Sequence, residues 1–131
     1  MSTTTSTAVS KVANVIVPVS DQDLQLGFYT EKLGLELRAD IPFGNGDRWI
    51  EVAPAGVETP IALCPPGPNA EAGNKQTGIT LQTEDIDAYH RALKERGVDV
   101  DEEVSRMGDP VPPLLWLRDP EGNELMVAEV R

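Results

Sequence analysis

The chain has 131 residues, of which 40% are hydrophobic, a length that fits one domain with a sizeable buried core. Its 22 acidic and 11 basic side chains give a formal net charge of -11, which argues against nucleic acid and anionic membranes as partners because like charges repel. Cys64 is the only cysteine, so an intrachain disulfide and a CxxC metal or redox motif are both excluded. A single thiol is compatible with a reducing cytoplasm.

Residues 1–10, MSTTTSTAVS, are small and polar and lack the basic start and apolar core of a signal peptide. We expect them to form a disordered tail before a single domain, 11–131. No run approaches the ~18 consecutive apolar residues of a membrane span. The sequence therefore predicts a soluble, cytoplasmic protein.

The first half begins with a β-branched run, 12–19, that predicts a strand. The segment SDQD then predicts a helix start, with Ser20 suited to cap the helix and Asp21 placed in its positive first turn. We expect the helix to run to about Leu33, because Gly34 is suited to the left-handed residue that ends a helix. Three apolar segments predict the strands that follow, 35–38, 49–53 and 61–64.

The second half repeats this order of elements. Asp85 matches Asp21 at an offset of 64 (85 − 21), and Gly97 ends the second predicted helix as Gly34 ends the first. The expected elements are a strand at 78–83, a helix at 84–96, and strands at 98–100, 114–118 and 125–128, with the DPEGN segment 119–123 as a hairpin turn. The chain is thus predicted to hold two βαβββ modules, 11–64 and 77–130, joined by a Pro/Gly-rich linker, 65–76.

A βαβββ unit buries its helix on one face of its sheet and leaves the other face concave, so two units must pair to cover these faces. The element order, the repeat and the segments VPVSDQDLQLGFYTEKLGLEL and LRDPEGNELMVAE resemble the vicinal oxygen chelate superfamily. That superfamily includes glyoxalase I, extradiol dioxygenases, fosfomycin-resistance proteins and bleomycin-binding proteins. The resemblance spans roughly residues 11 to 130. It implies an α+β fold in which two half-barrel sheets enclose a cavity.

Metal-dependent members of the superfamily place ligands on the first and last strands of each half. The resemblance carries these positions onto Asn14, Ala62, Gly78 and Met126. Gly78 and Ala62 have no donor atom, Met126 offers a soft thioether, and the Asn14 carbonyl is weak alone. We therefore expect neither a metal nor another cofactor. His90, the only histidine, lies within the second predicted helix, where a structurally neutral role is expected.

Alternation along the strands predicts which residues line the cavity, because side chains two apart share a face. Trp49 and Trp116 are added as candidates for stacking on a flat ligand, although the sequence does not fix their orientation or that of Glu51. Cys64 is expected to be an inert thiol, and the alternative that all these positions pack as core stays open. The predicted lining comprises Asn14, Ile16, Trp49, Ala62, Cys64, Gly78, Thr80, Gln82, Trp116, Glu124 and Met126.

Three functions are compatible with these observations. The preferred one is a glyoxalase/bleomycin-resistance-like protein whose metal-free cavity binds a small organic molecule, possibly cationic because the protein is acidic. The second is a metal-independent isomerase or lyase of glyoxalase type that uses Glu51, Gln82 or Glu124. The third is an accessory module with an unused cavity. In each case we expect a homodimer, and the sequence leaves open whether the pocket forms within one chain or across two.

Overall fold

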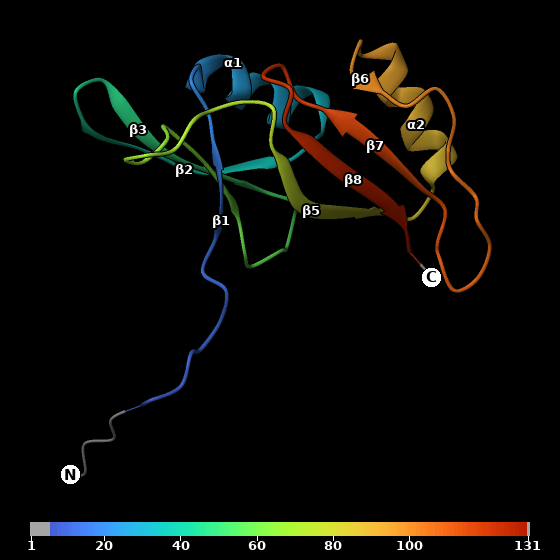
Figure 1. Cartoon of the computed structure of the whole chain (residues 1–131), viewed down its shortest axis with the longest axis horizontal. Coiled ribbons are helices and arrows are strands. Elements are labelled where there is room, and N and C mark those ends of the chain that lie inside the picture. Colours follow the sequence, from blue (N-terminus) through green and yellow to red (C-terminus); the bar gives the residue numbers. More distant parts are fainter. Residues whose placement is uncertain (1–5, 131) are drawn as a thin grey trace.

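The computed structural model describes residues 6–130 and contains two four-stranded sheets, one from each half of the chain (Figure 1). The sheets have the strand orders β1-β4-β3-β2 and β5-β8-β7-β6, so the same connectivity is used twice. The predicted α+β fold of two modules is therefore confirmed. In the first module the elements are β1 (Val15–Pro18), α1 (Gln22–Gly27), a π-helical turn η1 (Phe28–Lys32), β2 (Glu36–Gly44), β3 (Asp47–Ala53) and β4 (Ile61–Cys64). In the second they are β5 (Gln76–Thr83), α2 (Ile86–Glu95), β6 (Asp99–Val100), β7 (Leu114–Arg118) and β8 (Glu124–Glu129).

The repeat extends to the caps of the two helices. The side chain of Asp21 accepts a hydrogen bond from Leu24 N, and that of Asp85 accepts one from Ala88 N, each at 3.0 Å. The expectation that Ser20 caps the first helix is wrong, because Asp21 takes that position. An aspartate at the N-cap satisfies a free backbone N–H and places negative charge at the positive end of the helix dipole.

Strand β2 is much longer than the four residues predicted for it. It continues to Gly44 because it pairs with β3 in antiparallel register as far as the turn between the two strands. Pro42 interrupts the sequence signal of a strand, but β2 is an edge strand, where a missing backbone N–H is tolerated. Of the predicted tail, residues 1–5 lie outside the described residues, and residues 6–10 are exposed and belong to no helix or strand. None of the described helices is long and apolar enough to cross a membrane.

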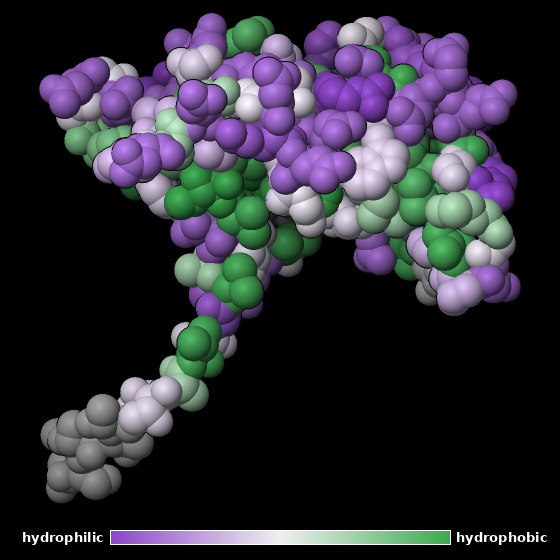
Figure 2. Space-filling view, in the orientation of Figure 1, coloured by the Kyte–Doolittle hydropathy of each residue, from purple (hydrophilic) through white to green (hydrophobic). Residues whose placement is uncertain are grey.

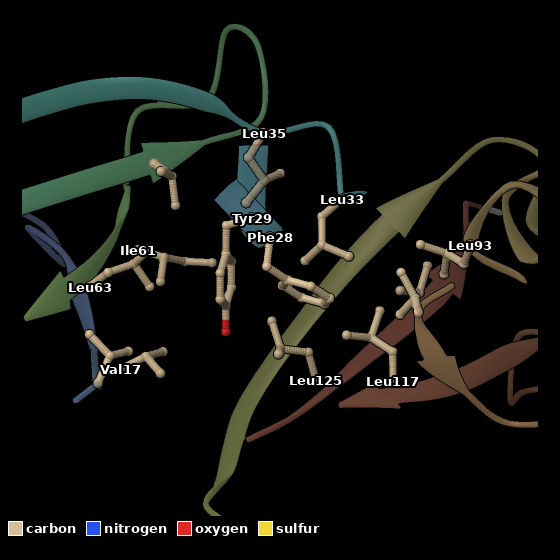
Figure 3. Packing of buried hydrophobic residues seen from close by; sticks show 14 of the residues in the cluster. Val17, Phe28, Tyr29, Leu33, Leu35, Ile61, Leu63, Leu93, Leu117 and Leu125 are labelled. Carbon is tan, nitrogen blue, oxygen red and sulfur yellow. The ribbon is translucent and has the colours of Figure 1, made fainter. Parts of the chain in front are cut away.

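A single apolar core runs through both modules. Phe28 and Tyr29 follow one another at the end of the first helix and meet edge to face, with ring centroids 5.4 Å apart. Figure 3 shows Tyr29 beside Ile61 of the first sheet and Phe28 directed toward Leu125 of the second. The first helix therefore packs on its own sheet and on the sheet of the other module.

The DPEGN turn, predicted as a hairpin turn between β7 and β8, also fastens the second module to the first. The buried carboxylate of Asp119 accepts a hydrogen bond from the hydroxyl of Tyr29 at 2.8 Å. The carboxylate of Glu121 accepts hydrogen bonds from Ser20 N at 2.8 Å, from Ser20 Oγ at 2.9 Å and from Asp21 N at 3.0 Å. Together these bonds hold the start and the end of the first helix to one turn of the other module.

The Tyr29–Asp119 contact should make folding stability depend on alkaline pH. Burial of the Tyr29 ring raises the pKa of its phenol far above the ordinary value near 10, and the adjacent Asp119 carboxylate raises it further. In the unfolded chain the phenol ionises near pH 10, whereas in the folded chain it stays neutral. Its contribution to stability is therefore fully present below about pH 10 and is lost as the pH rises above that value.

We predict that Tyr29→Phe lowers the free energy of unfolding by about 2 kcal/mol at neutral pH, because a hydrogen bond to a buried carboxylate is lost. The difference between wild type and variant should narrow above about pH 10. Urea denaturation across this range measures it. Tyr89→Phe serves as the control for the loss at neutral pH, since the Tyr89 hydroxyl donates to the neutral Leu33 carbonyl and its removal should cost less. The difference for Tyr89→Phe should also narrow above about pH 10, because burial raises the pKa of Tyr89 too. A difference that does not change with pH would contradict the assignment.

Candidate functional site: two open sheet faces

Strand register fixes which side chains of the first sheet face the helices and which do not. Ile50 and Val52 of β3 are completely buried on the helix side, in register with Leu63 and Ile61 of β4. The alternate residue of β3 between them, Glu51, pairs with Ala62 and lies on the opposite side. The residues on this opposite side form what we call face A: Ile16, Ile41, Trp49, Glu51, Ala62 and Cys64.

The second sheet is arranged in the same way. Leu115 and Val127 pair on the helix side and are completely buried. Met126 lies on the other side, in register with Trp116 of β7 and with Thr80 of β5. The residues on this side form face B: Thr80, Gln82, Trp116, Glu124 and Met126. The orientations that the sequence left open are thereby fixed, since both tryptophans and Glu51 lie on the faces that carry no helix.

Two of the predicted lining residues lie at the edge of this arrangement. Asn14 is half-buried and precedes the first residue of β1. Gly78 is exposed and adopts a φ of 73°, in a stretch of β5 where the register with β8 is irregular. Glycine accommodates this conformation, and a side chain there would be strained. The structure thus places nine of the predicted residues on the two open faces and these two at their margins.

Faces A and B lie side by side in one chain. In Figure 1 both helices lie on the upper side of the sheets, and the lower side carries no helix. Figure 2 shows mainly hydrophilic side chains over the helices and hydrophobic ones gathered on the lower side. Trp49, Trp116 and Met126 are each half-buried, so part of each side chain is exposed on its face.

The four positions inherited from metal-dependent relatives do not fit a divalent ion. Ala62 and Gly78 have no donor atom, the Met126 thioether is soft, and Asn14 supplies one amide oxygen. Within the part of the chain that the structure describes, no three His, Cys, Asp or Glu side chains are grouped so that they would hold a metal ion. No step of chemistry is therefore assigned to a metal here.

The two faces differ in how their carboxylates are paired. On face B, Glu124 lies 3.9 Å from the guanidinium of Arg118, which also binds Asp99 and Asp101 at 3.0 Å each. The hydrogen bond that Arg118 donates to Asp99 is the main reason that the pKa of Arg118 is raised, so this cation stays charged. On face A, the indole Nε1 of Trp49 donates a hydrogen bond to Glu51 at 2.9 Å. Sequence reasoning missed Arg118, although its position across from Glu124 follows from the DPEGN hairpin.

The surroundings of Cys64 and His90, the two side chains considered for reactivity, indicate structural roles. Cys64 is 4% exposed, and burial raises the pKa of its thiol, so little thiolate forms at neutral pH. The ring of His90 forms a hydrogen bond with the carbonyl of Asp101 at 2.7 Å and links α2 to the segment after β6. Both observations agree with the structural roles expected for these residues.

The geometry of residues 6–130 defines an α+β protein of two βαβββ modules with two sheet faces that carry no helix, and it groups no set of hard metal donors. Residues 11–127 match the model of the Glyoxalase/Bleomycin resistance protein/Dioxygenase superfamily. The chain belongs to this superfamily, as its sequence resemblance implied.

Several known proteins are similar to this chain over almost its whole length. A solved structure of TnmS3, an antibiotic binding protein from Streptomyces sp. CB03234, is similar with 36% identity and a TM-score of 0.82, covering 96% of this chain and all of that one. A glyoxalase/bleomycin resistance protein from the same source has 37% identity and a TM-score of 0.75, covering 90% and 99% of the two chains. The uncharacterized protein YetH of Bacillus subtilis is 30% identical over 92% of this chain and 99% of its own length.

Met126 and Val127 are adjacent residues on opposite sides of β8 and therefore test the assignment of the faces. We predict that Met126→Arg leaves the fold intact, because the new cation can reach solvent from face B. Val127→Arg should unfold the domain, because it buries an unpaired charge beneath the helices at a cost of several kcal/mol. Thermal unfolding followed by circular dichroism measures both. Equal destabilisation by the two substitutions would mean that position 126 is core packing.

Proposed function

We propose that this protein binds a small organic molecule of the antibiotic type between faces A and B, without a metal ion. The observation that carries the proposal is the lateral row Thr80–Met126–Trp116 on face B. Met126 stands at the position of a metal ligand in metal-dependent relatives, and the indole of Trp116 lies beside it. A mainly apolar surface with a small number of polar groups is typical of small-molecule binding sites. The similarity to an antibiotic binding protein over nearly the whole chain supports the same reading.

A homodimer is the second part of this proposal, because one chain leaves both faces open. Ile16 is 51% exposed and Ile41 is 57% exposed on face A. Aliphatic side chains grouped on a sheet face favour burial against another surface. A second copy offers its own face B to cover face A, so that each pocket would draw residues from two chains. A cytoplasmic location is proposed with it and is compatible with a free thiol at Cys64.

The binding function is tested by thermal-shift measurements with a panel of antibiotics that includes bleomycin, on wild type and on Met126→Arg. A compound that stabilises the wild type should lose its effect in the variant, because a cation then occupies the apolar row. Stabilisation that is equal in both proteins would place the binding site elsewhere.

We predict that light scattering at micromolar concentration gives about twice the chain mass of 14.2 kDa. Ile41→Asp should shift this value toward the monomer, since it puts a charge on face A. Leu24→Asp is the matched control, because Leu24 is equally apolar and 51% exposed but lies on α1, on the helix side. Dissociation by the Leu24 substitution alone would show that the dimer forms through the helices.

A metal-dependent activity of the superfamily is not supported, because three of the four ligand positions, Ala62, Gly78 and Met126, lack a hard donor. We predict that the purified protein carries less than one equivalent of Zn, Ni, Fe or Mn by elemental analysis. It should also fail to convert the methylglyoxal–glutathione adduct when these ions are added. One tightly bound transition metal per chain would overturn the assignment of the four positions.

A further inference from the structure

We propose that a cavity on the helix side of the molecule, where the two modules meet, binds an uncharged molecule with a single apolar ring. The cavity has a volume of about 170 Å³. Its floor is on the side of the second sheet that faces the helices, so it is separate from faces A and B and does not depend on the function proposed for them. The apolar residues that line it are Leu33, Leu35, Pro54, Ala55, Leu81 and Val127.

The internal repeat explains why a cavity exists at this place. Each module sends the turn between its last two strands toward the other module. The DPEGN turn closes its junction with a polar contact, the 2.8 Å hydrogen bond from the Tyr29 hydroxyl to Asp119. The corresponding turn of the first module, 54–60, presents only the ring of Pro54 and the methyl group of Ala55 to the cavity. Among the described residues, the hydrogen bonds of this turn stay within the first module, so the second junction is left partly unfilled.

Both modules contribute walls to the cavity. Leu33 and Leu35 follow the first helix and are only 4% and 8% exposed. Leu81 of β5 and Val127 of β8 are register neighbours and form the floor. Figure 3 shows Leu33 beside β5, which brings the end of the first helix next to the second sheet. Ala55 is exposed, so the cavity has an entrance from solvent on this side.

The polar side chains that border the cavity have partners of their own. The Tyr89 hydroxyl donates a hydrogen bond to the Leu33 carbonyl at 2.7 Å, and burial raises the pKa of Tyr89, so the phenol stays neutral. Thr83 Oγ1 accepts a hydrogen bond from Asp85 N at 3.4 Å, and Gln82 is exposed to solvent. A molecule in the cavity therefore needs no charge or hydrogen-bonding group. A charged one would lose hydration without gaining a partner.

The volume sets the size of the molecule. An engineered apolar cavity of about 150 Å³ in another protein stays dry and holds benzene, so apolar walls around such a space are sufficient for binding. At about 170 Å³, the cavity between the modules accommodates one ring with a small substituent. Binding removes the surfaces of the ring and of the leucine and valine side chains from water, which supplies the affinity.

The experiment titrates toluene into the full chain, labelled with ¹⁵N and in its methyl groups, and follows the titration by NMR. The wild type should show saturable shifts, with nuclear Overhauser contacts from toluene to the methyl groups of Leu33, Leu81 and Val127. Benzoate has the same ring but carries a charge, and it should give no such contacts.

Two tryptophan variants test the location. Ala55→Trp places an indole at the entrance without burying a new group in the core, and it should abolish the toluene contacts. Leu24→Trp is the matched control, because Leu24 is 51% exposed on α1 and lies outside the cavity, and it should bind toluene as the wild type does.

The inference is wrong if the wild type shows no saturable binding or if toluene contacts only Trp116 and Met126 on face B. Equal binding by wild type and Ala55→Trp would also overturn it, as would an equal loss in Ala55→Trp and Leu24→Trp. Contacts of benzoate with the same three methyl groups would refute the selection for an uncharged molecule. None of these outcomes bears on the antibiotic panel, which tests the proposed function separately.

Discussion

The buried hydrogen bond between Tyr29 and Asp119 fixes the relation between the two halves of the molecule. Its partners lie 90 positions apart, at the end of the first helix and in the turn between β7 and β8. Glu121, two residues beyond Asp119, accepts hydrogen bonds from three donors, Ser20 N, Ser20 Oγ and Asp21 N, at the start of the same helix. Both ends of the helix are thus held by one turn, and a polar contact inside an apolar core is stable only when its donors and acceptors match. The angle between the sheets, and with it the direction of faces A and B, depends on this turn.

The arrangement of the two sheets explains why no helix covers faces A and B within one chain. Both helices pack on the same side of their sheets, and Phe28 extends the core from the first module into the second on that side. The apolar packing that joins the modules is therefore on the helix side, and none of it covers Trp49 or Trp116. A protein arranged this way keeps its stability in one region and its exposed apolar surface in another. Three of the four positions that correspond to metal ligands in relatives, Asn14, Gly78 and Met126, lie at or on these faces and are at least partly exposed.

The sequence predicted the repeat, the helices and the side of β8 on which Met126 lies, because these depend on local pattern. The orientation of Trp49 and Trp116 needed the register with neighbouring strands, which a single strand does not contain. The role of the DPEGN turn was predicted only in part, since its turn geometry is local but its contacts with Ser20 and Tyr29 are not. The buried amide of Gln25, which has no hydrogen-bond partner among the described residues, carries no sequence signal at all. Such a group costs about 1 to 3 kcal/mol, and we have no physical account of its retention.

Net charge and local charge lead to different conclusions about the ligand. A value of -11 spread over the surface attracts any cation weakly and is screened by salt. Selectivity needs a carboxylate whose charge is not already neutralised by a neighbour. Face B fails this condition, because Arg118 lies beside Glu124 and is itself shared with Asp99 and Asp101. On face A, Glu51 has no ion pair among the residues described, and its carboxylate accepts a hydrogen bond from the neutral indole of Trp49.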